Sequence, residues 1–276
     1  MTEIHSPHNP RLKAVRHLHT KRGRARSGLF LAEGEDLIAA AEHAGRPLVE
    51  GYRLTGSGLG NDDFHEVERS ALASVSALGS GTRVIGTYNQ RWDTPAGPLC
   101  VYLHRVGDPG NVGTVLRSAQ AFGASCVALG PGCADPHGPK AVRASMGAIF
   151  TVSLAHVSDI ADLPGQRIAL VAGAGEPLRG PEDAGAGEPL RGSGDSGADT
   201  GLGGGERGAD GAVTLLVGSE RDGLPDELVA ACERVASIPI ATDSLNAAMA
   251  ATVALYELTR RPHRCPARPN DTVPAS

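Results

Sequence analysis

The stretch D-P-G-N-V-G-T-V-L-R-S-A-Q-A-F-G-A, from Asp108 to Ala124, predicts a turn followed by an amphipathic helix. A short apolar run at Leu99–Leu103 precedes it and predicts a strand that enters the Pro-Gly turn. We expect Asn111 to cap the helix and Gly123 to end it. Apolar residues at helical spacing predict one buried stripe, made of Val112, Val115, Leu116, Ala119 and Phe122. Asn111 and Arg117 lie outside this stripe, so we look for chemistry there.

Short apolar runs alternate with helical patterns from residue 99 onward. Such runs are typical of strands that are covered on both faces of a parallel sheet. The predicted strands are Leu99–Leu103, Ser125–Leu129, Ile149–Ser153, Ile168–Ala172, Val213–Val217 and Val235–Ile240. Because helical patterns separate them, we expect a doubly wound α/β domain over residues 99–261.

Residues 1–90 are predicted to form a smaller α/β unit. A basic helix is expected to start after Asn9 and to end at Gly23, and a mostly polar helix to cover Asn61–Ser70. The expected strands are Leu29–Ala32, Leu48–Leu54 and Arg83–Gly86. Residues 91–98 contain two prolines, a glycine and Trp92, and predict a linker whose tryptophan packs at the domain junction.

Two segments break the pattern. Residues 173–211 are rich in Gly, Asp and Glu and contain G-A-G-E-P-L-R-G twice, so we expect a flexible surface insertion that buries too little apolar area to become ordered. Its first G-A-G follows a strand, but Leu178 stands where a dinucleotide fingerprint needs its third glycine, which excludes that motif. Residues 262–276 are rich in proline and are expected to be disordered.

The composition, 41% hydrophobic and 21% charged, is typical of a globular protein. No window approaches 18 uninterrupted apolar residues and the N-terminus has no apolar signal core, so we expect a cytoplasmic protein without a membrane span. The five cysteines include no C-x-x-C pair, which argues against a disulfide framework or a zinc site, and no metal is expected.

Charge is unevenly distributed along the chain. A net charge of −5 argues against binding of nucleic acid through bulk charge. Between Arg11 and Arg26, however, seven Lys or Arg residues occur without a single acid. This local patch could neutralise phosphates, and a solvated helix face is an equally good explanation of the same pattern.

Two further segments place polar residues after predicted strands. G-S-E-R-D-G-L-P, Gly218–Pro225, follows Val213–Val217 and puts Glu220 at the carboxyl edge of the sheet, where open α/β sheets bind ligands. In Ser237–Leu258 a strand ends at I-P-I, and Asp243 or Ser244 is expected to cap an Ala-rich helix. The predicted buried stripe of that helix is Leu245, Ala248, Met249, Thr252 and Leu255.

Taken together and in this order, the three segments resemble motifs 1, 2 and 3 of the SpoU/TrmH-type RNA ribose 2′-O-methyltransferases of the SPOUT superfamily. N-P-R-L-K and F-L-A-E-G near the N-terminus resemble the substrate-binding extension of many members. The resemblance covers most of residues 5–260. It implies a C-terminal parallel-sheet α/β domain with a deep trefoil knot, and an N-terminal RNA-binding domain over residues 1–90.

The resemblance also implies a methyl donor, S-adenosylmethionine, and a set of site residues. The positions that match the polar catalytic set are Asn111, Arg117, Glu220, Ser244 and Asn246. Those that match cofactor-binding positions are Gly218, Ser219, Glu220, Ile238, Ile240, Leu245 and Asn246. Contacts with RNA are expected from Arg11, Lys13, Arg22, Arg24, Arg26, Glu33 and Arg143. Members are homodimers with composite sites, which allows Asn111 or Arg117 to serve a cofactor bound by the other subunit.

Methyl transfer from a sulfonium to a ribose hydroxyl requires in-line placement and removal of a proton, but no metal. Arg117 matches the residue to which the family usually assigns proton removal. Because an arginine with a pKa above 12 is a poor base, we favour an electrostatic role toward the phosphate and the developing alkoxide. The resemblance thus implies an S-adenosylmethionine-dependent 2′-O-methyltransferase, and by resemblance the 23S ribosomal RNA enzymes are favoured. A transfer RNA enzyme and a non-catalytic RNA-binding protein are the alternatives.

Overall fold

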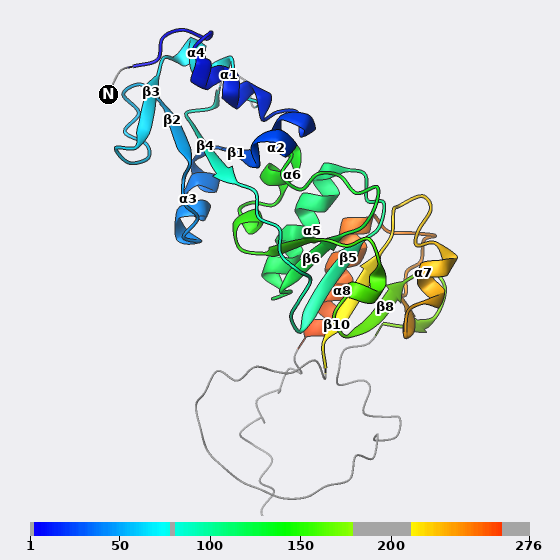
Figure 1. The fold of residues 1–276 in the computed structure, drawn as a ribbon. Coiled ribbons are helices and arrows are strands. Elements are labelled where there is room, and N and C mark those ends of the chain that lie inside the picture. The colour runs from blue at the N-terminus through cyan, green and yellow to red at the C-terminus, as the bar shows by residue number, and fades with distance from the viewer. Residues whose placement is uncertain (1–2, 78–80, 179–210, 261–276) are drawn as a thin grey trace, which may run out of the picture.

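The computed structural model describes residues 3–77, 81–178 and 211–260, which form two α/β domains (Figure 1). The N-terminal domain has a four-stranded sheet in the order β1-β4-β2-β3, in which only β2 and β3 run parallel. Its strands are β1 (Leu29–Glu33), β2 (Glu50–Leu54), β3 (Phe64–Val67) and β4 (Val84–Asn89). The C-terminal domain holds a larger sheet, described below.

Helices cover both faces of the N-terminal sheet. Helices α1 (Pro10–His17) and α4 (Arg69–Ala73) close a core with Tyr52 and Ile85 on one face. Helix α3 (Glu35–His43) packs on the other face, where its Leu37 joins the core of the C-terminal domain. The core on the α3 side of the N-terminal sheet is therefore continuous with the core of the C-terminal domain, whereas the core under α1 and α4 is separate.

The N-terminal helices differ from the prediction at two places. The basic helix ends at His17, and α2 (Lys21–Ser27) follows as a separate helix capped by Thr20. Gly23 lies inside α2 and does not end a helix. Glycine is needed there because a Cβ would stand 1.9 Å from the carbonyl oxygen of His17. The polar helix expected over 61–70 was wrong: residues 64–67 form β3, and α4 begins only at Arg69. Phe64 of β3 packs in the space beside Gly51 and Gly60.

The C-terminal domain contains a seven-stranded sheet in the order β7-β6-β5-β10-β8-β11-β9, and every neighbouring pair runs parallel. Its strands are β5 (Leu99–Leu103), β6 (Cys126–Leu129), β7 (Ser153–His156), β8 (Gln166–Leu170), β9 (Glu176–Pro177), β10 (Val213–Val217) and β11 (Arg234–Ser237). The predicted parallel α/β domain is confirmed. Residues 149–150, expected to begin a strand, belong instead to the short helix η2 (Ala148–Phe150), and β11 ends three residues before its predicted limit.

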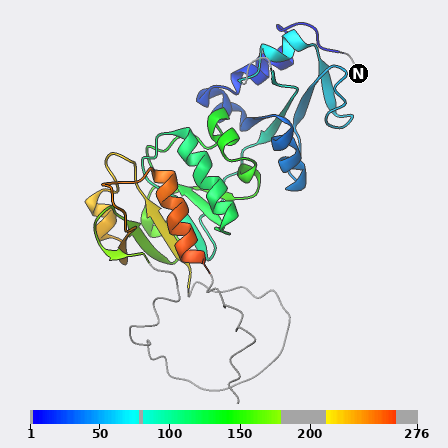
Figure 2. The ribbon, with the colours of Figure 1, turned by 180° about the vertical axis from the view of Figure 1, so that it is seen from behind.

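Helices cover both faces of this sheet as well. On one face α5 (Pro109–Ala121), α6 (Pro139–Ala144) and α8 (Ala247–Thr259) share a core with alternate residues of the strands. Figure 2 shows α5 and α8 side by side on this face. On the other face, a smaller core includes residues from η3 (Ile160–Asp162) and α7 (Asp226–Ala230). Coverage on both sides explains why the strands are almost continuously apolar.

The Gly-rich segment begins differently from its prediction. Residues 176–177 form β9, which pairs with β11 at the edge of the sheet. The next side chain, Leu178, is 5% exposed and belongs to the main core. The insertion therefore does not start at residue 173, because the backbone of residues 176–177 still takes part in the sheet. Residues 179–210 and the predicted tail at 262–276 lie outside the described residues.

A buried ion pair connects the two domains. Arg24 of α2 is 4% exposed, and its Nε and Nη2 donate to Asp135 Oδ2 at 2.9 and 2.7 Å. Its Nη1 donates to the carbonyl oxygen of Leu18 at 2.8 Å. Arg24 was predicted to contact RNA, but these bonds and its burial occupy the guanidinium inside the protein, so that prediction was wrong.

Aromatic rings pack beside this ion pair. His137 is buried, with its ring centroid 4.9 Å from that of Phe30 and 5.1 Å from that of Trp92. Trp92 also stacks on His156 at 3.7 Å. Burial lowers the pKa of His137 to about 4, so the imidazole is neutral near pH 7 and behaves as an aromatic packing group. The junction thus joins residues of both domains and of the segment between them.

We expect Arg24→Ala to lower the free energy of unfolding by about 3–5 kcal/mol, because it leaves the Asp135 carboxylate half-buried without its cation. Arg26→Ala removes the same charge from an exposed position on the same helix and should change stability by less than about 0.5 kcal/mol. Urea unfolding of both variants measures the difference. Equal small losses would show that the ion pair does not hold the domains together.

Candidate active site

The three motif segments meet at the carboxyl edge of the parallel sheet. Strands β5 and β10 are neighbours, and the amide N–H of His104 continues their pairing by donating to the carbonyl oxygen of Val217 at 2.9 Å. The loops that follow them therefore leave the sheet side by side. Helices α5 and α8 run parallel, since the Oγ atoms of Ser118 and Thr252 lie 2.6 Å apart and the rings of Phe122 and Tyr256 are also in contact.

Helix α5 starts one residue after Asp108. The Oδ1 of Asp108 accepts from the backbone N–H groups of Gly110 and Asn111 at 2.6 and 3.1 Å, and Pro109 occupies the first helical position. The cap predicted at Asn111 was therefore wrong. Lys140 donates to the other carboxylate oxygen at 2.7 Å, and this hydrogen bond is the main cause that lowers the pKa of Asp108. Asn111 lies in the first turn, where its side chain makes other contacts.

Helix α8 is capped by Asn246, not by Asp243 or Ser244. The Oδ1 of Asn246 accepts from the N–H groups of Ala248 and Met249 at 3.0 and 3.3 Å. Because the cap requires an oxygen, the amide nitrogen of Asn246 must point the other way. The capping geometry thus orients the side chain toward α5.

A chain of side-chain hydrogen bonds links the three motifs. Asn246 Nδ2 donates to Asn111 Oδ1 at 3.1 Å, and Asn111 Nδ2 donates in turn to the carboxylate of Glu220. The orientation of both amides follows from the cap of α8, since each amide has one donor end and one acceptor end. The structure therefore brings together three of the predicted catalytic residues from three separate segments, and it holds Glu220 through the α8 cap.

A pocket of about 400 Å³ opens beside this chain of hydrogen bonds. Seven predicted site residues line it: Gly218, Ser219, Glu220, Ile238, Ile240, Ser244 and Leu245. Asn246 and Asn111 do not line it and reach it only through Glu220. Sequence reasoning missed the wall formed by residues 170–172 after β8, because nothing local in the sequence indicates that β8 lies next to β10.

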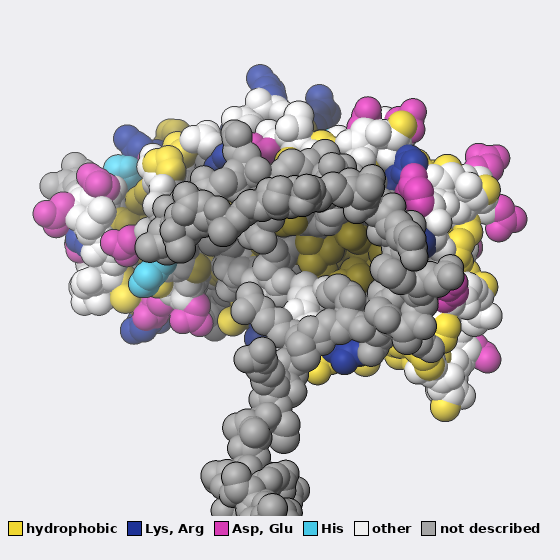
Figure 3. Space-filling model, turned by 90° about the horizontal axis from the view of Figure 1, so that it is seen from below, with side chains coloured by type: hydrophobic (Ala, Val, Ile, Leu, Met, Phe, Trp, Pro, Cys, Tyr) yellow, Lys and Arg dark blue, Asp and Glu magenta, His cyan; other side chains and the backbone are white. Residues whose placement is uncertain are grey.

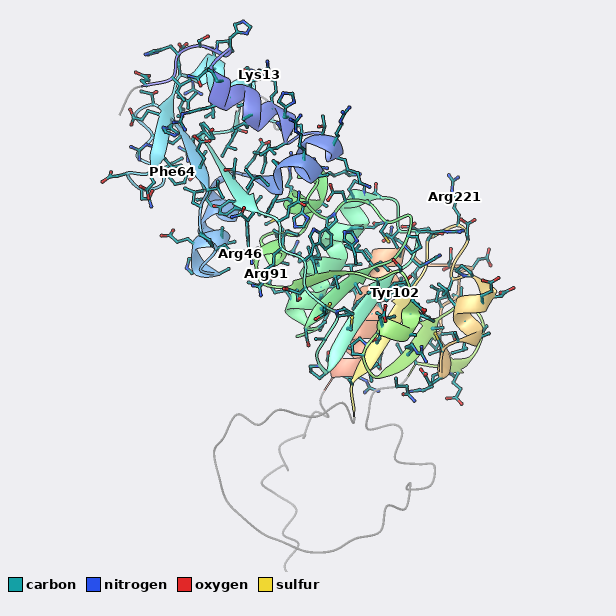
Figure 4. The ribbon with its side chains drawn as sticks, in the orientation of Figure 1. Lys13, Arg46, Phe64, Arg91, Tyr102 and Arg221 are labelled. Atoms are coloured by element: carbon teal, nitrogen blue, oxygen red, sulfur yellow. The ribbon has the colours of Figure 1, made fainter. Side chains whose placement is uncertain are left out.

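The loop after β10 is a closed turn. A Cβ on Gly218 would lie 2.1 Å from the carbonyl carbon of Gly223, so glycine is required for this close approach. Ser219 accepts at its carbonyl oxygen from Gly223 N–H at 3.0 Å and at its Oγ from Asp222 N–H at 3.1 Å. Arg221 extends from the loop away from the sheet (Figure 4). The turn fixes the backbone on either side of Glu220.

Arg117 does not join the other predicted catalytic residues. It is exposed on α5, and no hydrogen bond or ion pair joins it to any other described side chain. On the neighbouring α8, exposed apolar side chains occur at helical spacing, with Met249 58%, Val253 37% and Tyr256 52% exposed. Met249 was expected in the buried stripe of α8; that stripe instead consists of Ala247, Ala248, Ala251, Ala254 and Leu255. We call the exposed residues Arg117, Met249, Val253 and Tyr256 the α5–α8 face.

The residues predicted to contact RNA fall into different environments. Four are exposed basic residues: Lys13, Arg22, Arg26 and Arg143. Lys13 extends outward from α1 (Figure 4). Arg11 pairs with Glu50, and Glu33 accepts from the backbone of Ala77 and from the hydroxyl of Ser76 inside the domain. Seen from below, both domains carry acidic and basic side chains interspersed (Figure 3).

Two kinds of feature are absent from the part of the chain that the structure describes. No three or more His, Cys, Asp or Glu side chains lie close enough to one another to bind a metal ion. No described helix combines the length and the apolar character needed to cross a bilayer.

We expect Asn246→Ala to destabilise the protein by about 1 kcal/mol, because it removes the cap of α8. Asn246→Asp keeps the capping oxygens but cannot donate to Asn111, so it should keep most of the stability while releasing Glu220. Thermal unfolding measures the first effect, and amide chemical shifts of the Asn111 side chain measure the second. The double role of Asn246 is wrong if both variants are equally destabilised.

Comparison with protein families gives two matches. The SpoU rRNA Methylase family matches residues 98–256, and the MRM3-like substrate binding domain matches residues 9–85. Together the two matches cover both domains of the structure and include every predicted site residue. Because the first match spans more than half of the chain, it identifies the family.

Individual relatives agree with these matches. The 23S rRNA (guanosine(2553)-2′-O)-methyltransferase RlmP of Bacillus subtilis is 28% identical over 158 residues, 55% of this chain and 64% of that protein. The 23S rRNA (uridine(2479)-2′-O)-methyltransferase of Streptomyces viridochromogenes is 33% identical over 170 residues, 59% of this chain and 53% of that protein. The chain thus spans less than two thirds of the length of these curated relatives.

Among solved structures, the AdoMet-bound rRNA methyltransferase from Sinorhizobium meliloti has a TM-score of 0.73 and 28% identity, with coverage of 93% of this chain and 96% of that one. The likeness therefore includes both domains and their arrangement. The family match contains the Asp108 turn, the Gly218 loop and the α8 cap, which the fold brings to one edge. This chain belongs to the SpoU rRNA methylase family.

Proposed function

We propose that this protein transfers a methyl group from S-adenosylmethionine to a ribose 2′-hydroxyl of 23S ribosomal RNA in the cytoplasm. The observation that carries the proposal is the hydrogen-bond chain Asn246–Asn111–Glu220 beside the 400 Å³ pocket. Membership of the SpoU family supports the reaction class. The choice of RNA follows the Bacillus and Streptomyces relatives, whose names both state 2′-O methylation of 23S rRNA.

The pocket has a lining that suits S-adenosylmethionine. Its volume lies within the range of small-molecule sites, and apolar side chains such as Leu170, Leu224 and Ile238 offer contact for an adenine ring. Carboxylates at Glu220, Asp222 and Asp243 also line it and favour a cationic sulfonium. When bound, S-adenosylmethionine supplies an electrophilic methyl group. The residues that would hold it are those of the Gly218 loop, residues 238–245 and residues 170–172.

The protein's own contribution is positioning. Asn111 and Asn246 hold the Glu220 carboxylate at the rim of the pocket, where it can accept a hydrogen bond from the ribose hydroxyl. Holding two reactants in the reactive arrangement can by itself supply roughly 7–11 kcal/mol of the barrier. The α8 cap orients Asn246, which orients Asn111 and, through it, Glu220.

The α5–α8 face supports a homodimer. Its apolar side chains Met249, Val253 and Tyr256 are exposed in the single chain, and burial against a second copy would remove them from water. Arg117 is exposed on the neighbouring helix α5, and the proposed dimer carries its guanidinium to the partner's pocket. There it would stabilise charge on the phosphate and on the developing alkoxide.

The trefoil knot implied by the resemblance belongs to the same proposal. Strand β10 follows β5 and β8 in the sequence but lies between them in the sheet. The segments that follow β10 and β11 both contribute to the pocket. A knotted path would tie these two segments together and keep the pocket walls in fixed relation.

Binding and transfer assays test the proposal directly. We expect S-adenosylmethionine to bind the wild-type protein in isothermal titration calorimetry, and radiolabelled methyl groups to enter ribosomal RNA. Asn111→Ala should lower methyl transfer by about 100-fold, the usual loss for one preorganised polar contact. Gln120→Ala, which changes an exposed amide at the far end of α5, should leave the rate unchanged.

Mapping of ribose methylation then separates the alternatives. Label in 23S ribosomal RNA supports the proposal, whereas label confined to transfer RNA would overturn the choice of substrate. A protein that binds RNA but neither binds S-adenosylmethionine nor incorporates label would be a non-catalytic RNA-binding module.

Mixing two inactive variants tests the composite site. We expect Arg117→Ala and Glu220→Ala each to be inactive alone. If Arg117 serves the partner's pocket, each mixed dimer has one intact site out of two. About half of the dimers are mixed after random exchange, so the mixture recovers roughly a quarter of the wild-type rate. If Arg117 acts in its own subunit, every site in the mixture lacks one group and no activity returns. Light scattering should give a dimer for the wild type and a monomer for Met249→Lys/Tyr256→Lys.

A further inference from the structure

A second, larger pocket lies in the N-terminal domain, and the methyl-transfer reaction does not use it. It has a volume of about 650 Å³ and lies between α1, α2 and the strands β1, β2 and β4. We call it the α1–α2 groove. Its lining includes Arg22 and Arg26 of α2, Leu29 of β1, Val49 and Glu50.

The packing of α2 decides which arginines face the groove. Arg24 points into the domain junction, where it pairs with Asp135. Residues two positions before and after it in a helix lie on the opposite side, so Arg22 and Arg26 share one face, one turn apart. Gly23 allows α2 to approach the end of α1 closely, and this approach forms the wall of the groove. Because Arg24 is held in the domain junction, Arg22 and Arg26 face the groove.

The groove offers an apolar surface below a basic rim. Val15, Leu18 and Tyr52 are buried at its base, while Leu29 is half-buried and Val49 is 47% exposed. Arg22 and Arg26 form no ion pair with any carboxylate that the structure describes. An apolar floor with uncompensated cations at the rim suits a planar base that carries a phosphate on each side.

Glu50, the acidic residue that lines the groove, is paired within the domain and does not repel an anionic ligand. Glu50 accepts from the hydroxyl of Tyr52 at 2.6 Å and from His65 Nε2 at 3.2 Å, and it pairs with Arg11. Burial alone would raise the pKa of Glu50, but the hydrogen bonds from Tyr52 and Arg11 outweigh it and lower the pKa. The charge of Glu50 is therefore balanced within the domain, and the rim keeps its positive charge.

The helices that form the groove lie on the same side of the molecule as the candidate active site. Helices α1 and α2 and the carboxyl edge of the parallel sheet border the same open angle between the domains in both views (Figures 1 and 2). The Arg24–Asp135 ion pair connects α2 to the loop before α6, and so holds the two surfaces in fixed relation. A nucleic acid strand that lies in this angle can reach both.

We propose that the α1–α2 groove binds one unstacked nucleotide of a single-stranded segment in the RNA substrate. The base lies against Val49 and Leu29, and the flanking phosphates contact Arg22 and Arg26. This inference rests on the proposed function, since it concerns the RNA that is methylated. Single-stranded loops are the usual targets of specific RNA recognition, because their bases are available for stacking and hydrogen bonding.

Fluorescence anisotropy with a labelled single-stranded RNA of about twelve nucleotides tests the phosphate contacts. We expect the single strand to bind more tightly than a duplex of equal length. Arg26→Ala should weaken binding about tenfold, and should reduce the slope of log Kd against log salt by about 0.7, the effect of one lost phosphate contact. Arg69→Ala, an exposed arginine of α4 in the same domain, is the matched control and should change Kd less than twofold. Equal effects of the two variants would overturn the proposal.

Crosslinking tests the position of the base. The same RNA with 4-thiouridine should form crosslinks to peptides that contain residues 22–29 or 49–52, and Val49→Glu should abolish them. Crosslinks confined to other parts of the chain would overturn the proposal. Calorimetry with S-adenosylmethionine keeps the two proposals distinct. Arg26→Ala should bind the cofactor like the wild type. If the wild type does not bind the cofactor, that result contradicts the methyl-transfer function and not the RNA groove.

Discussion

The parallel pairing of β5 with β10 is the constraint on which the candidate site depends. It joins residues 99–103 to residues 213–217 over five consecutive positions and places the ends of both strands at one edge. The Asp108 turn and the Gly218 loop must then leave the sheet together. Helix α8 completes the arrangement by lying beside α5, so that Asn246 reaches Asn111. Three segments that are far apart in sequence become one site through this strand pairing and the packing of α8 on α5.

The second level of organisation is the fixed junction between the domains. A buried ion pair is weak evidence for stability in general, because desolvation offsets much of the attraction. Here the Arg24 guanidinium uses all three nitrogens, two toward Asp135 and one toward Leu18, so its geometry is fully specified. The neighbouring rings of Phe30, His137 and Trp92 add apolar contact across the same boundary. The domains accordingly behave as one unit with two surfaces around a common angle.

Much of the C-terminal fold could be predicted from the sequence, and details at the helix ends could not. The continuous apolar runs specified a parallel α/β domain, because both faces of such a sheet are buried. The cap of α5 was assigned to Asn111 although Asp108, with Pro109 after it, is the better combination, and both residue types cap well. β3 was missed because its short segment is largely polar, and the space that accepts Phe64 is provided by Gly51 on the neighbouring strand and by Gly60 in the preceding turn. Arg24 was grouped with the surface arginines because sequence alone does not reveal which side of a short helix faces Asp135.

The parallel arrangement of α5 and α8 also has an electrostatic consequence. Both helices have 13 residues, and both begin at the carboxyl edge of the sheet, next to Glu220. Aligned peptide dipoles give each helix an N-terminal end equivalent to roughly half a positive charge, and this field decays within the first turn. Two such ends beside one another favour negative charge at this edge even though the whole chain carries a net charge of −5. The backbone dipoles thus attract anionic groups at this edge, an effect that the net charge calculated from acidic and basic side chains does not include.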